Sequence, residues 1–170
     1  MPATYEPIAT TTLGSAAATI TFSSISSAYT DLRLVVFLLK DSATSTNSLD
    51  IRFNSDTGSN YSSTFLRGDG STADSFRYTS DTNIDCGETT PTTTIGHLIT
   101  VDIFGYAGST NKTCLITTSA DANGSGQVSR GVGLWRSTSA INTVSMAANF
   151  TSGANMGTGT TATLYGILKA

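Results

Sequence analysis

The residue types best suited to chemistry are concentrated between positions 54 and 71, in the stretch NSDTGSNYSSTFLRGDGS. Asn54, Asp56 and Asn60 bring side-chain oxygens close together, and a calcium ion or a sugar could use such oxygens. The tripeptide Arg67-Gly68-Asp69, which integrins recognise, follows in the same stretch. Both signals suggest a ligand-binding loop.

A structural explanation accounts for the same residues. Calcium prefers about six to eight oxygens with several carboxylates, whereas this stretch offers one carboxylate and two amides. Asp56, Gly58 and Asn60 are residue types that form tight turns. We therefore interpret the segment as a turn between two strands, and the Arg-Gly-Asp triplet as incidental to a second turn.

Other catalytic groups are scarce. A nucleophile–base hydrolase needs an imidazole near its Ser or Cys, and the one histidine, His97, is expected as a structural residue at the start of a strand. One His and two distant Cys cannot supply the roughly three or four ligands of a zinc site. A glycosidase needs only two carboxylates, but most acidic residues here lie in polar turns. The sequence predicts no enzyme, cofactor or metal site.

Composition points to an unusual surface. Of the 170 residues, 38% are hydrophobic and 12% are charged, about half the usual charged share. Ser and Thr together make up about a third of the chain. The net charge of −3 and the absence of a basic patch argue against nucleic-acid binding.

We expect the protein in the cytosol, because the sequence has neither a signal peptide nor an apolar run long enough to span a membrane. The N-terminus, MPATYEPIAT, has no basic segment followed by an apolar run, so we expect no signal peptide. The longest apolar run, residues 34–39, is too short to span a bilayer. In a reducing cytosol Cys86 and Cys114 are expected as free thiols, with a bridge between them the open alternative.

Hydrophobic periodicity is almost entirely of period two, which is typical of strands. Residues 48–54 alternate cleanly, whereas residues 31–40 become continuously apolar, as a central strand buried on both faces would. Turn clusters of Gly, Asn, Asp and Ser separate these segments. We expect strand character within residues 18–25, 31–40, 48–54, 63–68, 97–106, 113–120, 132–137, 143–150 and 161–168.

Nine or ten short strands without a convincing helix predict an all-β protein, an antiparallel β-sandwich with jelly roll as the expected topology. The polar segment 86–94 is expected to be a long loop. No linker divides the chain. The predicted organisation is an extended N-terminal arm, residues 1–13, followed by one sandwich domain, residues 14–170.

Several passages resemble a family of small virion proteins of tailed bacteriophages. The most specific are YEPIATTTL (5–13), RFNSDTGSNYS (52–62), GLWRSTSAI (133–141) and LYGI (164–167), and the similarity extends from Thr4 to Ala170. The resemblance implies a structural protein of the virion that folds in the bacterial cytoplasm. Either a trimeric capsid decoration (cement) protein or a fibre, head-spike or tail-adhesion module that binds host glycan is compatible with it.

The residues expected to make partner contacts follow from these roles. Apolar residues in an exposed arm need a surface to bury them, so Tyr5, Pro7 and Ile8 are predicted to contact the major capsid protein or another virion protein. Trp135 and Arg136 are predicted at a homotrimer interface, although a core position for Trp135 is also open. If a glycan is bound, the predicted loop residues are Asn60, Tyr61 and Asp69.

Overall fold

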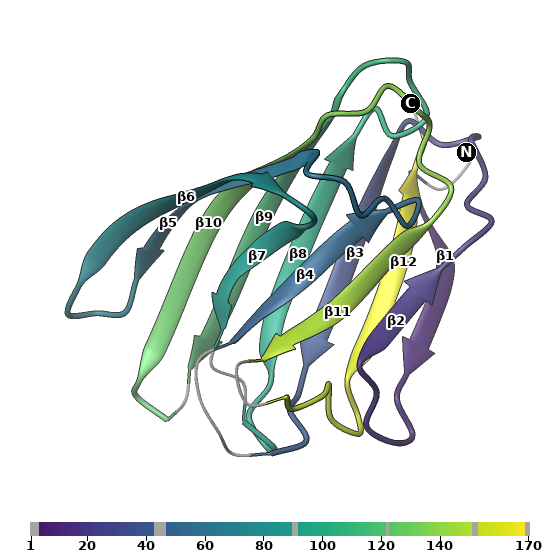
Figure 1. Ribbon diagram of the computed structural model, residues 1–170. Helices are drawn as coiled ribbons and strands as arrows, with labels where there is room; N and C mark the ends of the chain where they lie inside the picture. Colours follow the sequence, from purple (N-terminus) through teal and green to yellow (C-terminus); the bar gives the residue numbers. More distant parts are fainter. Residues whose placement is uncertain (1–3, 43–46, 90–91, 122, 151–152, 169–170) are drawn as a thin grey trace.

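The chain folds into two antiparallel sheets that pack face to face (Figure 1). The computed structural model describes residues 4–42, 47–89, 92–121, 123–150 and 153–168, and this part of the chain contains strands and no helix. The predicted all-β antiparallel sandwich is therefore confirmed. The sheets are unequal in size, with eight and four strands, and the jelly-roll topology stays a prediction.

The larger sheet has the strand order β1-β12-β3-β8-β9-β10-β5-β6. Consecutive strands along the chain, such as β8, β9 and β10, are neighbours, while β12 lies between β1 and β3. The strands of this sheet are β1 (Tyr5–Thr12), β12 (Thr161–Ile167), β3 (Asp31–Leu38), β8 (His97–Phe104), β9 (Lys112–Asp121), β10 (Gly126–Trp135), β5 (Tyr61–Gly68) and β6 (Ala73–Asp81).

The smaller sheet has the order β2-β11-β4-β7 and covers one face of the larger sheet. In Figure 1 the β5–β6 hairpin extends beyond this cover at the left of the molecule. The strands of the smaller sheet are β2 (Thr19–Phe22), β11 (Val144–Phe150), β4 (Asn47–Phe53) and β7 (Ile84–Thr89).

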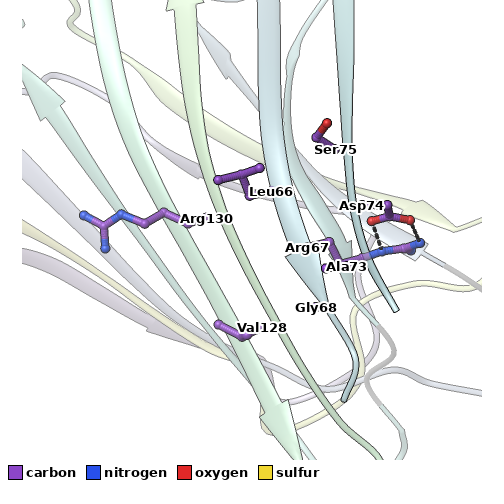
Figure 2. A pocket seen from close by; sticks show the side chains of 8 residues that line it. All are labelled: Leu66, Arg67, Gly68, Ala73, Asp74, Ser75, Val128 and Arg130. Atoms are coloured by element: carbon purple, nitrogen blue, oxygen red, sulfur yellow. Dashed lines mark hydrogen bonds and ion pairs between the residues drawn. The ribbon is translucent and has the colours of Figure 1, made fainter. Parts of the chain in front are cut away.

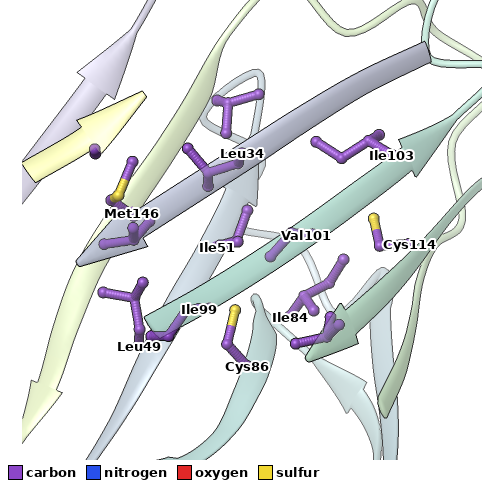
Figure 3. Packing of buried hydrophobic residues seen from close by; sticks show 14 of the residues in the cluster. Leu34, Leu49, Ile51, Ile84, Cys86, Ile99, Val101, Ile103, Cys114 and Met146 are labelled. Atoms are coloured by element: carbon purple, nitrogen blue, oxygen red, sulfur yellow. The ribbon is translucent and has the colours of Figure 1, made fainter. Parts of the chain in front are cut away.

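The core forms because alternating side chains point between the sheets. In β3 the buried positions are Leu32, Leu34, Val36 and Leu38, and none of these side chains is exposed. Figure 3 shows side chains of both sheets meeting in this space. The labelled ones are Leu34, Leu49, Ile51, Ile84, Cys86, Ile99, Val101, Ile103, Cys114 and Met146.

The expectation that residues 31–40 are buried on both faces is wrong. β3 alternates between buried and more accessible positions, and Phe37 is 46% exposed. The reason is that the smaller sheet covers only one face of the larger sheet. The other face, which we call the outer face, has no second layer among the described residues.

The expected N-terminal arm is extended, but it belongs to the sandwich. Strand β1 pairs with β12 from Tyr5↔Ile167 to Thr12↔Thr161, with a bulge between Pro7 and Ala9. It is therefore an edge strand of the larger sheet. Residues 1–3 of the predicted arm lie outside the described residues.

Besides β1, two strands were not expected from the sequence. Strand β6 carries Phe76 and Tyr78 on one face but is otherwise polar, and β7 falls largely inside the segment 86–94 that was predicted as a loop. Pairing with β4 explains β7, because a neighbouring strand satisfies its backbone groups whatever its side chains are. Its register shifts between Ser48 and Asp50 of β4, which disrupts the apolar alternation that sequence analysis relies on.

Candidate functional site

The segment between β4 and β5 is a turn whose polar groups bond within the chain. Asn54 accepts hydrogen bonds from the backbone of Asn142 (2.9 Å) and Thr143 (3.1 Å) through its Oδ1. Its amide donates to the carbonyl of Ala140 (2.8 Å). Asn54 and Ser55 have φ of 51° and 56°, in the left-handed region that turns commonly require. This confirms the interpretation of the segment as a turn.

Asp56 organises the rest of this turn. Its carboxylate accepts hydrogen bonds from the Gly58 amide (2.8 Å), the Asn60 side chain (2.9 Å) and the Trp135 indole (2.7 Å). These bonds hold the pKa of Asp56 below its usual value, with the Trp135 bond the largest cause. The side-chain oxygens of Asn54 and Asp56, which suggested a calcium or sugar site, are thus engaged in internal hydrogen bonds.

Trp135 and Arg136 belong to the same structure. The Arg136 guanidinium donates to the carbonyls of Ser59 (3.0 Å) and Tyr61 (3.2 Å). The Tyr61 ring stacks on Trp135 with centroids 6.2 Å apart, and its hydroxyl donates to the Phe53 carbonyl (3.2 Å). We call this set, Asp56, Asn60, Tyr61, Trp135 and Arg136, the turn clasp.

Two sequence-based assignments are corrected by this arrangement. Trp135 is 2% exposed and therefore lies in the core, so its side chain cannot form a subunit interface. Tyr61 is fully buried and cannot be a contact residue of a glycan loop. The sequence placed these residues in two different sites, whereas the fold combines them in one internal clasp because β5 and β10 are neighbours, with Tyr61 opposite Trp135.

The Arg-Gly-Asp triplet is also engaged internally. Arg67 forms a bidentate ion pair with Asp74 (2.6 and 3.1 Å) and a second ion pair with Glu88. Asp69 accepts hydrogen bonds from the backbone of Ser71 (2.9 Å) and Thr72 (2.7 Å) and so shapes the exposed β5–β6 turn. An internally paired Arg67 supports the view that the triplet is incidental.

The predicted contact residues of the N-terminus have different environments. Tyr5 is 45% exposed, and Pro7 is exposed as well. The Tyr5 ring meets Tyr165 edge to face (6.4 Å between centroids), and the Arg33 guanidinium lies 5.6 Å from its centre. Ile8 is half-buried against the core at the bulge. Tyr5 and Pro7 remain available to a partner, whereas Ile8 contributes to the packing of its own chain.

Reactive side chains are buried and dispersed. Cys86 and Cys114 are free thiols inside the core, where burial raises the pKa of each well above its ordinary value. Such thiols are unreactive. His97 begins β8, as predicted, and is buried. Within the described residues no group of three or more His, Cys, Asp and Glu side chains is placed to hold a metal ion.

A largely buried carboxylate pair was not predicted. Asp50 of β4 lies opposite Asp85 of β7, and Asp50 is only 9% exposed. Burial, together with the negative charge of Asp85, raises the pKa of Asp50 to about 7. Ser48 donates a hydrogen bond to Asp50 (3.3 Å). The sequence could not indicate this pair, because nothing in the polar segment around Asp85 revealed its register with β4.

The outer face carries exposed apolar side chains. Leu66 is 68% exposed and Val128 is 54% exposed, and they lie on the neighbouring strands β5 and β10. Figure 2 shows them near Arg130, with the Arg67–Asp74 pair to their right. These residues line an open groove of about 500 Å³. The sequence signal for this face was the pair of adjacent apolar residues Phe65 and Leu66, of which only one can point inward in a strand.

Comparison with known proteins adds no relative: no family model, curated protein or solved structure matches this chain. The likeness to phage virion proteins therefore depends on the sequence passages quoted above. None of the residues described by the structure forms a helix that could cross a membrane.

Proposed function

We propose that this protein is a structural component of a tailed-bacteriophage virion, assembled in the host cytoplasm, where it decorates the capsid as a cement protein. In this role it binds the major capsid protein or another virion protein and stabilises the shell through contacts of a homotrimer. It performs no turnover and uses no cofactor. The quoted sequence passages suggest the virion, and the surface of the fold suggests the structural role.

The observation that carries the proposal is that the polar groups of the turn clasp are bonded within the chain, whereas the outer face is exposed. Polar groups that suggested ligand chemistry are bonded internally, as the Trp135–Asp56 hydrogen bond illustrates. The surface that remains accessible is instead the outer face, which is rich in Thr and in exposed apolar side chains. Large exposed apolar patches are typical of protein–protein contacts.

The experiment compares particles assembled with and without the gene for this chain. We expect the protein to remain with purified heads after tails are removed. Heads without it should release their DNA at a lower temperature, because the added contacts no longer hold neighbouring capsid subunits together. Equal heat resistance of the two kinds of head would reject the cement role, and recovery of the protein with tails would favour the alternative below.

The alternative role is a fibre, head-spike or tail-adhesion module that binds host glycan. The groove beside Leu66 favours it, because this groove combines an apolar wall with the polar side chains of Ser75 and Arg130. Asp69, an exposed residue of the predicted glycan loop, lies in the adjacent turn. Binding to host-surface polysaccharide that is lost in Arg130→Ala and retained in Arg136→Ala would support this role.

A further inference from the structure

Exposed apolar side chains are concentrated on one side of the molecule. Within the described residues, seven of the eight large hydrophobic side chains that are exposed lie on the outer face, and the eighth, Tyr78, lies on the opposite face of β6. The seven are Tyr5 (45% exposed), Phe37 (46%), Leu66 (68%), Leu98 (46%), Phe104 (47%), Val128 (54%) and Val132 (45%).

Strand register places four of these residues, Phe37, Leu98, Val128 and Val132, in two rows. Phe37 pairs with Leu98, Leu98 with Ser119, and Ser119 with Val128. This row crosses four strands with one hydroxyl between apolar side chains. A second row contains Val132, which lies beside Leu115 of β9 and Thr64 of β5. The face is therefore one surface and not a set of isolated residues.

The area of the face is sufficient for a stable complex. Eight strands spaced about 4.8 Å apart, each presenting about 25 Å of length, give a face of roughly 1,000 Å². A standard specific interface buries about 800 Å² on each partner. A second sheet packed at the usual separation of about 10 Å could cover the face completely.

Charge is distributed unevenly along the face. At its centre Arg33 and Asp102 pair through two hydrogen bonds of 2.5 and 2.9 Å and neutralise each other. The end formed by β10, β5 and β6 presents Arg130 and Arg77. The guanidinium of Arg130 has no hydrogen-bond or ion-pair partner among the described residues. One end of the outer face is therefore cationic.

The opposite end has complementary chemistry. Tyr5 of β1 and Tyr165 of β12 place aromatic rings there, with the Arg33 guanidinium beside the Tyr5 ring, and Asp31 of β3 adds a carboxylate that also accepts a hydrogen bond from the Gly105 amide (2.7 Å). Guanidinium groups bind favourably to aromatic faces and to carboxylates. The two ends of the same face are thus suited to each other, although they lie at opposite sides of one molecule and cannot meet within it.

From these observations we propose that the outer face of the eight-stranded sheet binds a second copy of this chain, with the Arg77 and Arg130 end of one copy meeting the Tyr5, Tyr165 and Asp31 end of the other. The apolar rows between the two ends become buried in the contact. A twofold arrangement satisfies this pairing, because one copy turned about an axis parallel to the strands lays each end over the opposite end of its partner. The proposal rests on the structural role proposed above and adds to it a pairwise contact distinct from those of the homotrimer.

Light scattering behind a sizing column tests the proposal on the purified full chain. We expect the wild-type protein to be an oligomer. The double substitution Leu66→Ser and Val128→Ser should raise the dissociation constant by about tenfold or more, because two exposed apolar side chains are no longer buried in the contact. Tyr78→Ser is the matched control, since Tyr78 is similarly exposed on the opposite face, and it should leave the mass unchanged.

A charge reversal provides a second, independent variant. Arg130→Glu should also weaken association, and circular dichroism should show that each variant remains folded. A wild-type protein that stays monomeric at its highest attainable concentration overturns the proposal, as does an oligomer that both outer-face variants leave intact. Neither result decides whether the protein stabilises the shell, which the particle experiment tests separately.

Discussion

The indole nitrogen of Trp135 lies 2.7 Å from a carboxylate oxygen of Asp56, although 79 positions separate the two residues in the chain. This hydrogen bond joins the end of β10 to the turn that precedes β5. The segment between β4 and β5, which most resembled a ligand site in the sequence, is therefore a structural turn. Asp56 is the centre of the clasp because it also accepts bonds from Gly58 and Asn60.

The first prediction concerns this bond. Trp135→Phe keeps an aromatic ring in the core but removes the donor, and we expect it to lower the free energy of unfolding by about 1–2 kcal/mol. Asp56→Ala removes the acceptor of three bonds and should cost about 3 kcal/mol. Urea denaturation at neutral pH measures both values. An Asp56→Ala protein as stable as the wild type would show that the clasp contributes nothing to stability.

The second prediction concerns pH. The pKa of Asp50 is raised from an ordinary 3.8 to about 7, so between these values the folded protein holds a proton that the unfolded chain releases. Stability contributed by this group is therefore lost as pH rises from about 4 to 7, by up to about 4 kcal/mol. Asp50→Asn should flatten that part of the stability profile and stabilise the protein at pH 8.

The matched control for this measurement is Asp121→Asn, because Asp121 is exposed at the end of β9. Urea denaturation at several pH values should give this variant the wild-type slope. If Asp50→Asn shows the wild-type slope as well, the pKa of Asp50 is not raised in the folded protein.

The third prediction concerns the ion pairs of Arg67. Arg67→Ala leaves Asp74 and Glu88 without their common partner, and we expect a loss of about 1–2 kcal/mol in the free energy of unfolding. Arg130→Ala, at an exposed position, should change the stability by less than about 0.5 kcal/mol. Thermal denaturation of the two variants in parallel provides the test, and equal melting temperatures would contradict it.

The fourth prediction uses two glycines. A side chain at Gly157 would overlap the backbone carbonyl of Lys40, which cannot move aside as a flexible side chain can. We expect Gly157→Ala to destabilise the protein by about 3 kcal/mol. A side chain at Gly14 would meet nothing within 4 Å, so Gly14→Ala should be close to neutral. Similar chemical-denaturation midpoints for the two variants would be inconsistent with this packing.

The fifth prediction concerns the thiols. Cys86 and Cys114 are free and buried, so a chromogenic thiol reagent should label neither in the native protein and both after denaturation without reductant. The rate of labelling under native conditions then reports unfolding. If fewer than two thiols react in the denatured protein, Cys86 and Cys114 form a disulfide and the prediction is wrong.

Much of the fold could be predicted because strand periodicity is a local property. Side chains of a strand alternate between its faces, so segments such as residues 48–54 revealed β4 directly. The turn at Asn54 was also predictable, since Asn and Gly permit backbone conformations that other residues avoid. In contrast, the sequence did not reveal β7, because apolar and polar side chains alternate little along it. Its backbone hydrogen bonds are made with β4, which is distant in the sequence.

The sequence by itself determined the all-β class and the turns, because each depends on residues close together in the chain. Only the tertiary structure decided which residues meet. It placed Trp135 on Asp56 and Asp50 opposite Asp85, and it left Phe37 exposed where sequence analysis expected burial. Strand order and the extent of the covering sheet set these outcomes, and both arise from pairings between distant segments that local periodicity does not encode.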